Sequence, residues 1–179
     1  MPASGQARWG WHRLSPLWAD QIVADAQVSS GDLVVDIGAG TGALTASLVA
    51  AGARVIAVEL HPQRIDVLRK RFAHDPVTVV RADAAGLRLP RRPFRVVANP
   101  PFAASTAILR RLLAPGSRLV AADVVLPHWV GRRWALGTAP GAGRWSRDHT
   151  VGLGSRIPRA AFTPPATSDC TTLVIRRCR

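Results

Sequence analysis

The sequence predicts an α/β fold with a mostly parallel, seven-stranded sheet and a C-terminal antiparallel hairpin. Short apolar runs alternate with amphipathic runs from Gly31 onward, and glycine or proline separates most of them. The last two apolar runs follow each other across a proline-containing stretch. Alternating strand and helix patterns favour a parallel sheet covered by helices. A chain of 179 residues can bury one compact core of this kind.

The expected elements succeed one another regularly through the first two thirds of the chain. Ser15-Pro16 predicts a helix start, because proline fits the first helical position, and this helix should extend to about Val28. Strands are then expected at 33–37, 54–59, 77–81, 94–98 and 118–126, with helices at 41–51, 62–72 and 105–113.

The segment 128–149 interrupts this pattern. It is rich in arginine, tryptophan and glycine, and it predicts a partly helical, exposed insertion that buries little. The final strands are expected at 150–157 and 171–177. We therefore divide the chain into a basic and aromatic N-terminal arm with its helix, 1–30, and one α/β domain, 31–179.

The chain is strongly basic. Lys and Arg total 24 against 11 Asp and Glu, the formal net charge is +13, and Lys70 is the only lysine. This excess favours a polyanionic partner, since the planar arginine fork donates paired hydrogen bonds to phosphate and stacks on bases. A GC-rich genome would explain part of the lysine deficit, but not the excess over acids.

Cysteine spacing and hydropathy exclude several classes of protein. Cys170 and Cys178 have neither a metal-binding nor a disulfide spacing, so we expect reduced cysteines and no metal. No apolar run has the length of a signal peptide or a membrane span. We expect a cytoplasmic monomer without a membrane partner.

Acids and glycines gather where the predicted strands end. The run 36–42, Asp-Ile-Gly-Ala-Gly-Thr-Gly, leads from a strand through a turn, where Gly38 and Gly40 let a ligand approach the backbone. Its G-x-G-x-G spacing differs from the dinucleotide fingerprint. The preceding acid, Asp36, repels a pyrophosphate but suits the cationic methionine end of S-adenosylmethionine.

Two further acids follow the next strands. Glu59 can accept hydrogen bonds from both ribose hydroxyls, and Asp83, with Ala84, can bind the adenine of the same cofactor. Each element alone is also explained as an ordinary turn or helix cap. Because open α/β sheets bind ligands at the carboxyl ends of their strands, the three acids together favour a nucleotide-type cofactor.

The fourth strand ends in Asn99-Pro100-Pro101-Phe102. A conjugated exocyclic amine is a poor nucleophile, and its reactivity rises when both N–H groups donate to fixed acceptors. The side-chain oxygen of Asn99 and the carbonyl of Pro100 are such acceptors, and proline holds them rigidly. Phe102 can stack on the substrate base. The alternative is a plain strand-to-helix turn.

These motifs together resemble the erythromycin-resistance (Erm) rRNA adenine N6-methyltransferases and their relatives, the rRNA adenine dimethylases. Members carry a G-Q-N/H-F-L box, a D-I-G-x-G-x-G-x-L-T turn, a V-E strand end, a D-A turn, an N-x-P-[YF] motif and a late F-x-P-x-P-x-V-x-S segment. The counterparts here are 10–14, 36–45, 58–59, 83–84, 99–102 and 162–168.

The resemblance implies roles for individual residues. Cofactor contacts would be made by His12, Leu14, Gly38, Glu59, Asp83 and Asn99. Phe102 and Phe162 would sandwich the target adenine. Trp11 and Arg13 stand where the family usually has glutamine and phenylalanine.

The resemblance also implies a fold, an activity and a substrate. Residues 31–179 would be a Rossmann-like class I methyltransferase domain, as in the short actinobacterial and mycobacterial members that lack a helical C-terminal domain. The implied reaction is S-adenosylmethionine-dependent methylation of an adenosine in the peptidyl-transferase region of 23S rRNA. Its consequence would be macrolide, lincosamide and streptogramin B resistance.

The RNA, naked or in a ribosome assembly intermediate, would then have to be bound by arginine and tryptophan side chains. Our candidates are Arg8, Trp11, Arg13, Arg132, Arg133, Trp134 and Arg144. In the alternative interpretation, the tryptophans anchor loops to the core.

Other functions share part of this pattern. A glutamine-amide methyltransferase acting on a protein, or a DNA adenine methyltransferase, would use the same activation of a conjugated nitrogen. A nucleic-acid-binding module with a vestigial cofactor fold and an NAD-dependent oxidoreductase are alternatives from other classes. The retained acids argue against the former, and the glycine spacing argues against the latter.

Overall fold

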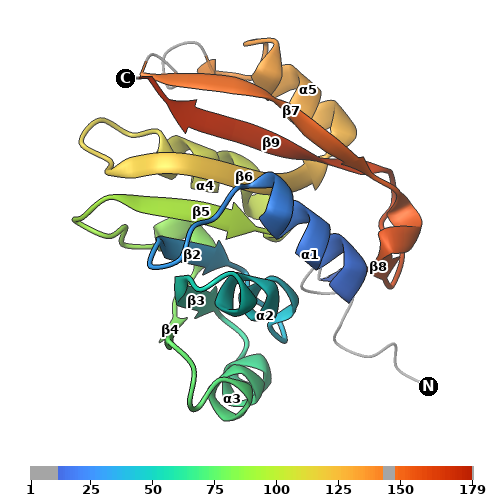
Figure 1. The fold of residues 1–179 in the computed structure, drawn as a ribbon. Coiled ribbons are helices and arrows are strands. Elements are labelled where there is room, and N and C mark those ends of the chain that lie inside the picture. Colours follow the sequence, from blue (N-terminus) through green and yellow to red (C-terminus); the bar gives the residue numbers. More distant parts are fainter. Residues whose placement is uncertain (1–11, 143–147, 179) are drawn as a thin grey trace.

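A computed structural model of the protein describes residues 12–142 and 148–178. Within this part of the chain, seven strands form one sheet in the order β4-β3-β2-β5-β6-β9-β7 (Figure 1). Their bounds are β2 (Leu33–Ile37), β3 (Arg54–Glu59), β4 (Val77–Arg81), β5 (Phe94–Ala98), β6 (Leu119–Pro127), β7 (His149–Ile157) and β9 (Cys170–Arg177). The strands from β4 to β6 pair in parallel, and β9 pairs antiparallel with β6 and β7. The predicted mostly parallel sheet with its C-terminal hairpin is confirmed.

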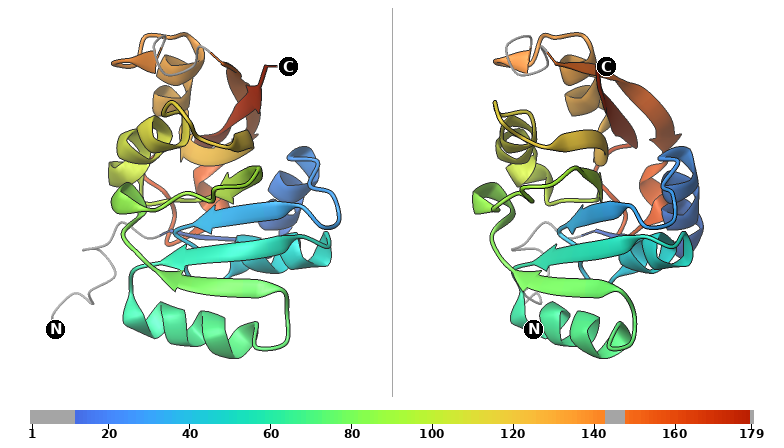
Figure 2. Two further views of the ribbon diagram at one scale, coloured as in Figure 1. Left: turned by 90° about the vertical axis from the view of Figure 1, so that its left-hand side faces the viewer. Right: turned by 60° about the vertical axis from the view of Figure 1, so that its left-hand side comes forward.

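Helices cover both faces of this sheet. They are α1 (Pro16–Asp25), α2 (Ala43–Ala50), α3 (Pro62–Arg71), α4 (Ser105–Leu112) and α5 (His128–Ala135). Side chains of α1 and α2 share one buried cluster, and those of α4 and α5 share another. Figure 2 shows these two pairs on opposite sides of the sheet. Because both faces are covered, central strands such as β2 are buried along their whole length.

Two helix boundaries differ from the sequence prediction. The first helix ends at Asp25, before Gln27, which adopts a φ of 52° outside the helical region. The second helix begins at Ala43, because Gly42 precedes it in the left-handed conformation. No helix in the described ranges is long and apolar enough to cross a membrane.

The segment after β6 is partly helical, as expected, but it buries more than predicted. Trp134 is only 3% exposed and belongs to the core cluster that contains Leu126 and Leu173. Val130 and Trp134 are four residues apart, so both lie on the face of α5 that packs against the sheet. Trp129, in the first turn of the same helix, remains 62% exposed.

A second, two-stranded sheet was not predicted. It consists of β1 (Arg13–Leu14) and β8 (Phe162–Thr163), which pair antiparallel with Arg13 opposite Thr163. Just beyond β1, the backbone N–H of Ser15 donates to the carbonyl of Ala161 at 2.9 Å. This pairing fixes the N-terminal segment against the late part of the chain, near the carboxyl ends of the parallel strands.

Candidate active site

The carboxyl ends of β2, β3, β4 and β5 surround a cavity of about 510 Å³. The lining of this cavity includes most residues that were predicted from the strand ends: Gly38, Glu59, Asp83, Ala84, Asn99, Pro100 and Phe102, together with His12. Chemical groups from four loops thus meet at one edge of the sheet, as expected for an open α/β fold.

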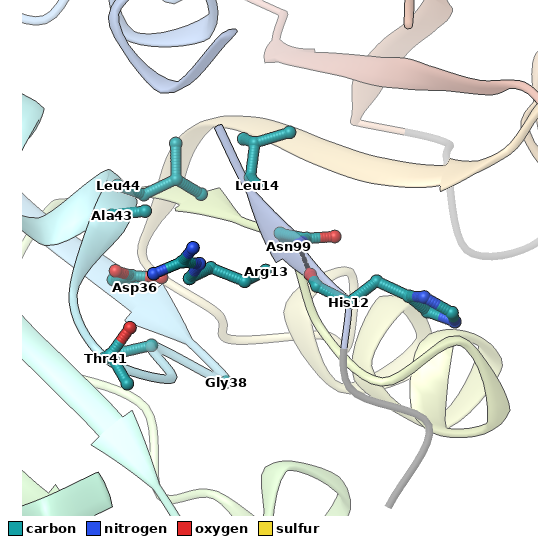
Figure 3. A pocket seen from close by; sticks show the side chains of 10 residues that line it. His12, Arg13, Leu14, Asp36, Gly38, Thr41, Ala43, Leu44 and Asn99 are labelled. Carbon is teal, nitrogen blue, oxygen red and sulfur yellow. Dashed lines mark hydrogen bonds between the residues drawn. The ribbon is translucent and has the colours of Figure 1, made fainter. Parts of the chain in front are cut away.

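A smaller pocket adjoins this cavity, since His12, Gly38 and Asn99 line both. Arg13, Asp36 and other residues complete its wall. Figure 3 shows the side chains around it, with Arg13 crossing the space between β1 and the glycine turn. The site therefore has a large compartment and a small, charged one.

The glycine turn borders both compartments, since Gly38 lines each of them. Gly38 has a φ of 77°, and its N–H donates to the carbonyl of Val58 at 2.8 Å. A Cβ atom at this position would lie 3.1 Å from the ring of Pro101 and 3.2 Å from the Cα of Pro100. Glycine is thus needed both for the backbone conformation and for the close approach of the Asn99–Phe102 motif.

Asp36 lies in the wall of the small pocket and is 1% exposed. The hydroxyl of Thr45 donates to Oδ2 at 2.7 Å, whereas Oδ1 accepts no hydrogen bond from any described residue. Burial raises the pKa of this carboxyl to about 7, a net value that includes the lowering by the hydrogen bond from Thr45 and the raising by the nearby Glu59. A buried carboxylate oxygen without a partner fits a cationic or N–H group of a ligand.

Glu59 lines the large cavity and also accepts a hydrogen bond from the glycine turn. Its Oε2 accepts from the N–H of Gly40, and its Oε1 accepts from the N–H groups of Leu60 and His61, all at 2.9 Å. These bonds orient the carboxylate at the end of β3. Oε1 uses both of its lone pairs in these bonds, whereas Oε2 keeps one, so the predicted acceptor role toward ribose hydroxyls falls to Oε2.

Asp83 likewise both accepts a backbone hydrogen bond and lines the large cavity. One oxygen accepts from the N–H of Ala85 at 2.9 Å and caps the short 3-10 turn Ala84–Gly86. The side chain is exposed and lines the large cavity. Its second oxygen accepts no hydrogen bond from the described residues, and it is available to a ligand amino group.

The amide of Asn99 is held in one orientation. Its Nδ2 donates to the backbone carbonyl of His12 at 2.9 Å, which leaves Oδ1 as an acceptor toward the cavity. Among the described residues, none donates to the carbonyl of Pro100. Two adjacent acceptors are thus available where the sequence predicted an exocyclic amine.

His12 supports this arrangement. Its Nδ1 lies 2.9 Å from the carbonyl of Pro164, and because a carbonyl can only accept, Nδ1 carries the hydrogen. The imidazole stacks on Phe102 with ring centres 5.9 Å apart and an interplanar angle of 21°. The cofactor box predicted around His12 and Leu14 is thereby tied to the Asn99–Phe102 motif.

The expected position of Phe162 requires a correction. This side chain is 1% exposed and packs in the core with Leu14 and Val97. Its ring meets that of His12 edge-on at 6.5 Å. In this structure, the aromatic side chain that stacks on Phe102 is His12. Phe162 is instead part of the core, because it lies opposite Leu14 in the pairing of β8 with β1.

The predicted RNA-binding residues are placed in different ways. Arg132 and Arg133 are exposed on α5. The prediction that Trp134 binds RNA is wrong, because a side chain buried against the sheet cannot stack on a base. Arg13 lines the small pocket. The remaining candidates, Arg8, Trp11 and Arg144, lie outside the described residues.

The sheet order, the glycine turn and the acids at the strand ends define a Rossmann-like domain of the methyltransferase type. The crystal structure of the 23S rRNA methyltransferase ErmE shares this fold, with a TM-score of 0.79 and 24% identity over 90% of this chain and 67% of that one.

Sequence comparison places the domain in a family. Residues 13–147 match the family described as ribosomal RNA adenine dimethylase, and the chain belongs to it. It is 37% identical over 147 residues to an rRNA adenine N-6-methyltransferase of Corynebacterium diphtheriae, covering 80% of this chain and 57% of the relative. It is 38% identical over 148 residues to the mycinamicin-resistance protein MyrB of Micromonospora griseorubida, covering 80% and 46%. The chain thus spans about half the length of these relatives.

Proposed function

We propose that this protein transfers a methyl group from S-adenosylmethionine to the exocyclic N6 of an adenosine in ribosomal RNA. The observation that carries the proposal is the pair of acceptors at Asn99 Oδ1 and the Pro100 carbonyl, next to the Phe102 ring. We further propose that the RNA is 23S rRNA, in its peptidyl-transferase region. Resistance to macrolide, lincosamide and streptogramin B antibiotics is the expected consequence.

The residues at the site fit this methyl donor. When bound, S-adenosylmethionine supplies an electrophilic methyl group on a positively charged sulfur. The orphaned Oδ1 of Asp36 suits the ammonium of its methionine end. Glu59 and Asp83 line the large cavity as acceptors for ribose hydroxyls and for the adenine amino group. The residue set is acidic where the donor carries positive charge or N–H groups.

The chain's contribution to the reaction is mainly positioning. Asn99 and Pro100 accept one N–H each from the substrate amine, which draws its lone pair away from the ring and toward the methyl carbon. Phe102 holds the base by stacking. With the donor bound, the positioned nitrogen would take the methyl group while the sulfur kept the electrons of the broken bond, and the nitrogen would then release a proton to water. The alkylated nitrogen is acidic, so no general base is required.

The net charge of the chain and its similarity to rRNA methyltransferases support RNA as the substrate. The formal net charge of +13 favours a polyanion. Arg132, Arg133 and the exposed Trp129 on α5 are the described side chains that we propose for phosphate contact and stacking. The names of the relatives, an rRNA adenine N-6-methyltransferase and a mycinamicin-resistance protein, support an rRNA adenosine over DNA or a protein glutamine.

Expression in a macrolide-susceptible bacterium tests this function. We expect raised inhibitory concentrations for macrolides, and a primer-extension stop at a peptidyl-transferase adenosine of 23S rRNA. A strain producing Asn99→Ala should show neither. Methylation of duplex DNA or of release factors by the purified protein, with no transfer to naked 23S rRNA or to assembly intermediates, would contradict the proposal.

A further inference from the structure

The connection from β4 to β5 differs from the other parallel crossovers of the sheet. Those crossovers contain α2, α3 and α4, whereas this one contains the 3-10 turn Ala84–Gly86 and an irregular loop. In an α/β fold, a helix ordinarily covers the sheet face beside such a connection. Here the loop covers it incompletely, and a cavity of about 490 Å³ opens beside Leu33, Ile56 and Val80 of the sheet.

Two further cavities continue this one along the amino ends of the parallel strands. One of about 430 Å³ shares residues 89–91 with it and reaches the loop before β6, and one of about 420 Å³ shares Ile56 and Arg92 and reaches the start of β4. We call the three cavities together the amino-end groove. Figure 1 shows the loops that lead into β5 and β6 on its left side, away from the arrowheads of both strands. The active site lies at the carboxyl ends, and the five residues of β5 span about 16 Å between the two ends.

Exposed arginine side chains line the amino-end groove. None of them forms an ion pair with an acid in the described ranges, and Asp75 is the one acidic residue among the described residues of the lining. Arg111 also donates through Nε to the carbonyl of Leu87, which ties α4 to the loop before β5. A concave surface with unpaired charges of one sign attracts anions. The arginines of the lining are Arg54, Arg88, Arg91, Arg92, Arg111 and Arg118.

The chemistry of this lining matches a phosphate backbone. The planar arginine fork donates paired hydrogen bonds to phosphate oxygens. Among the described residues, no aromatic side chain lines the groove, so it offers no stacking platform for unpaired bases. A double-stranded RNA segment presents phosphates and keeps its bases paired, and proteins recognise such segments largely through their shape and backbone. The groove therefore fits a paired segment better than a single strand.

We propose that the amino-end groove binds the phosphates of a double-stranded segment of the substrate rRNA while the active site holds the target adenosine. This inference rests on the proposed function for the identity of the substrate. It gives the chain a second RNA contact, at the end of the sheet opposite the catalytic motif. Since the two sites lie at opposite strand ends, the bound segment belongs to a helix that flanks the target hairpin. Recognition would then depend on the fold of the RNA as well as on the target loop.

RNA binding measured at several salt concentrations, with the full chain and without methyl donor, tests the proposal. The probe is a 23S rRNA fragment that contains the peptidyl-transferase region and its flanking helices. The groove variant combines Arg91→Gln with Arg118→Gln, one in each loop of the cavity between β5 and β6. Each phosphate contact contributes close to one power of the salt concentration. We therefore expect the slope of log K against log salt to become shallower by about 2, and the affinity at about 0.1 M salt to fall about tenfold or more.

A matched variant and a shortened RNA make the experiment specific. Arg69→Gln with Lys70→Gln, at exposed positions of α3 outside the groove lining, removes the same charge and should leave the slope unchanged. The fragment cut back to the target hairpin should bind the wild type more weakly, and the groove variant should lose no further affinity for it. Thermal unfolding shows that each variant is folded. Arg91→Lys with Arg118→Lys keeps the charges and should retain most of the slope.

The outcomes separate this inference from the function on which it rests. Equal changes of slope in the groove variant and in the α3 variant would overturn it, because net charge alone would then explain the binding. An unchanged slope in the groove variant, or an equal loss of affinity for the shortened RNA, would overturn it as well. Groove-dependent binding by a protein that transfers no methyl group to any RNA would instead reject the proposed function and leave the groove as an RNA-binding surface.

Discussion

Asp36→Asn should change how stability depends on pH. Burial raises the pKa of Asp36 from 3.8 to about 7 in the folded protein. The folded state therefore keeps this proton at pH values where the unfolded chain has lost it, and unfolding becomes easier as pH rises from about 4 to about 7. Each pKa unit corresponds to about 1.4 kcal/mol, so the free energy of unfolding should fall by about 4 kcal/mol over the whole interval.

An asparagine at this position cannot ionise. Between pH 5 and pH 7, the free energy of unfolding of the wild type should therefore fall by about 2 kcal/mol relative to that of the variant, and the difference should level off above about pH 8. Urea unfolding followed by tryptophan fluorescence measures this difference at each pH. Asp66→Asn, on an exposed position of α3, controls for the removal of a carboxylate.

A pH-independent difference between wild type and Asp36→Asn would exclude the raised pKa, because it would mean that the buried carboxyl ionises as it does in water. The same ionisation should be visible in ligand binding. If Asp36 must be charged to hold an ammonium, the affinity for S-adenosylhomocysteine should rise with pH up to about 7 in the wild type only.

Three further substitutions have distinct expected effects. Gly38→Ala should destabilise the protein by at least about 1 kcal/mol and weaken S-adenosylhomocysteine binding, since the new Cβ would press on Pro100 and Pro101. Gly31→Ala, which shares the left-handed conformation without such contacts, should cost stability alone. Phe102→Ala should raise the KM for RNA and leave cofactor affinity unchanged, and Phe102→Tyr should retain stacking; a changed cofactor Kd with unchanged KM would contradict this role. Arg176→Ala should lower the free energy of unfolding by about 3 kcal/mol, because it leaves the buried Asp123 without its two bonds of 2.8 and 3.0 Å; a loss below about 1 kcal/mol in urea titration would show that the pair contributes little.

Local patterns sufficed for the main sheet. Strand limits such as Leu33–Ile37 and Phe94–Ala98 agree with the prediction, because buried parallel strands are short apolar runs bounded by turns. The acids and Asn99 were located for the same reason, since a residue at a strand's carboxyl end is placed by the sheet itself.

Features that depend on distant pairing were missed. The strands β1 and β8 have two residues each and lie far apart in the sequence, so neither carries a periodic signal. Their pairing nevertheless decides that Phe162 is buried and that Arg13 lines a pocket. The burial of Trp134 follows from the spacing of Val130 and Trp134 on a helix, a signal that was present but obscured by the surrounding arginines.

We propose that Asn99 and Pro100 activate an adenine amine of rRNA toward a bound methyl donor. Mass spectrometry of nucleosides from 23S rRNA, after incubation with the purified protein and S-adenosylmethionine, tests it directly. We predict N6-methylated adenosine with the wild type and a loss of about 100-fold or more in rate with Asn99→Ala, comparable to the removal of one preorganised hydrogen bond at a reacting centre. Cofactor affinity should be largely retained in that variant. Comparable turnover by Asn99→Ala, or a methyl group found elsewhere than on N6 of adenosine, would exclude this activation.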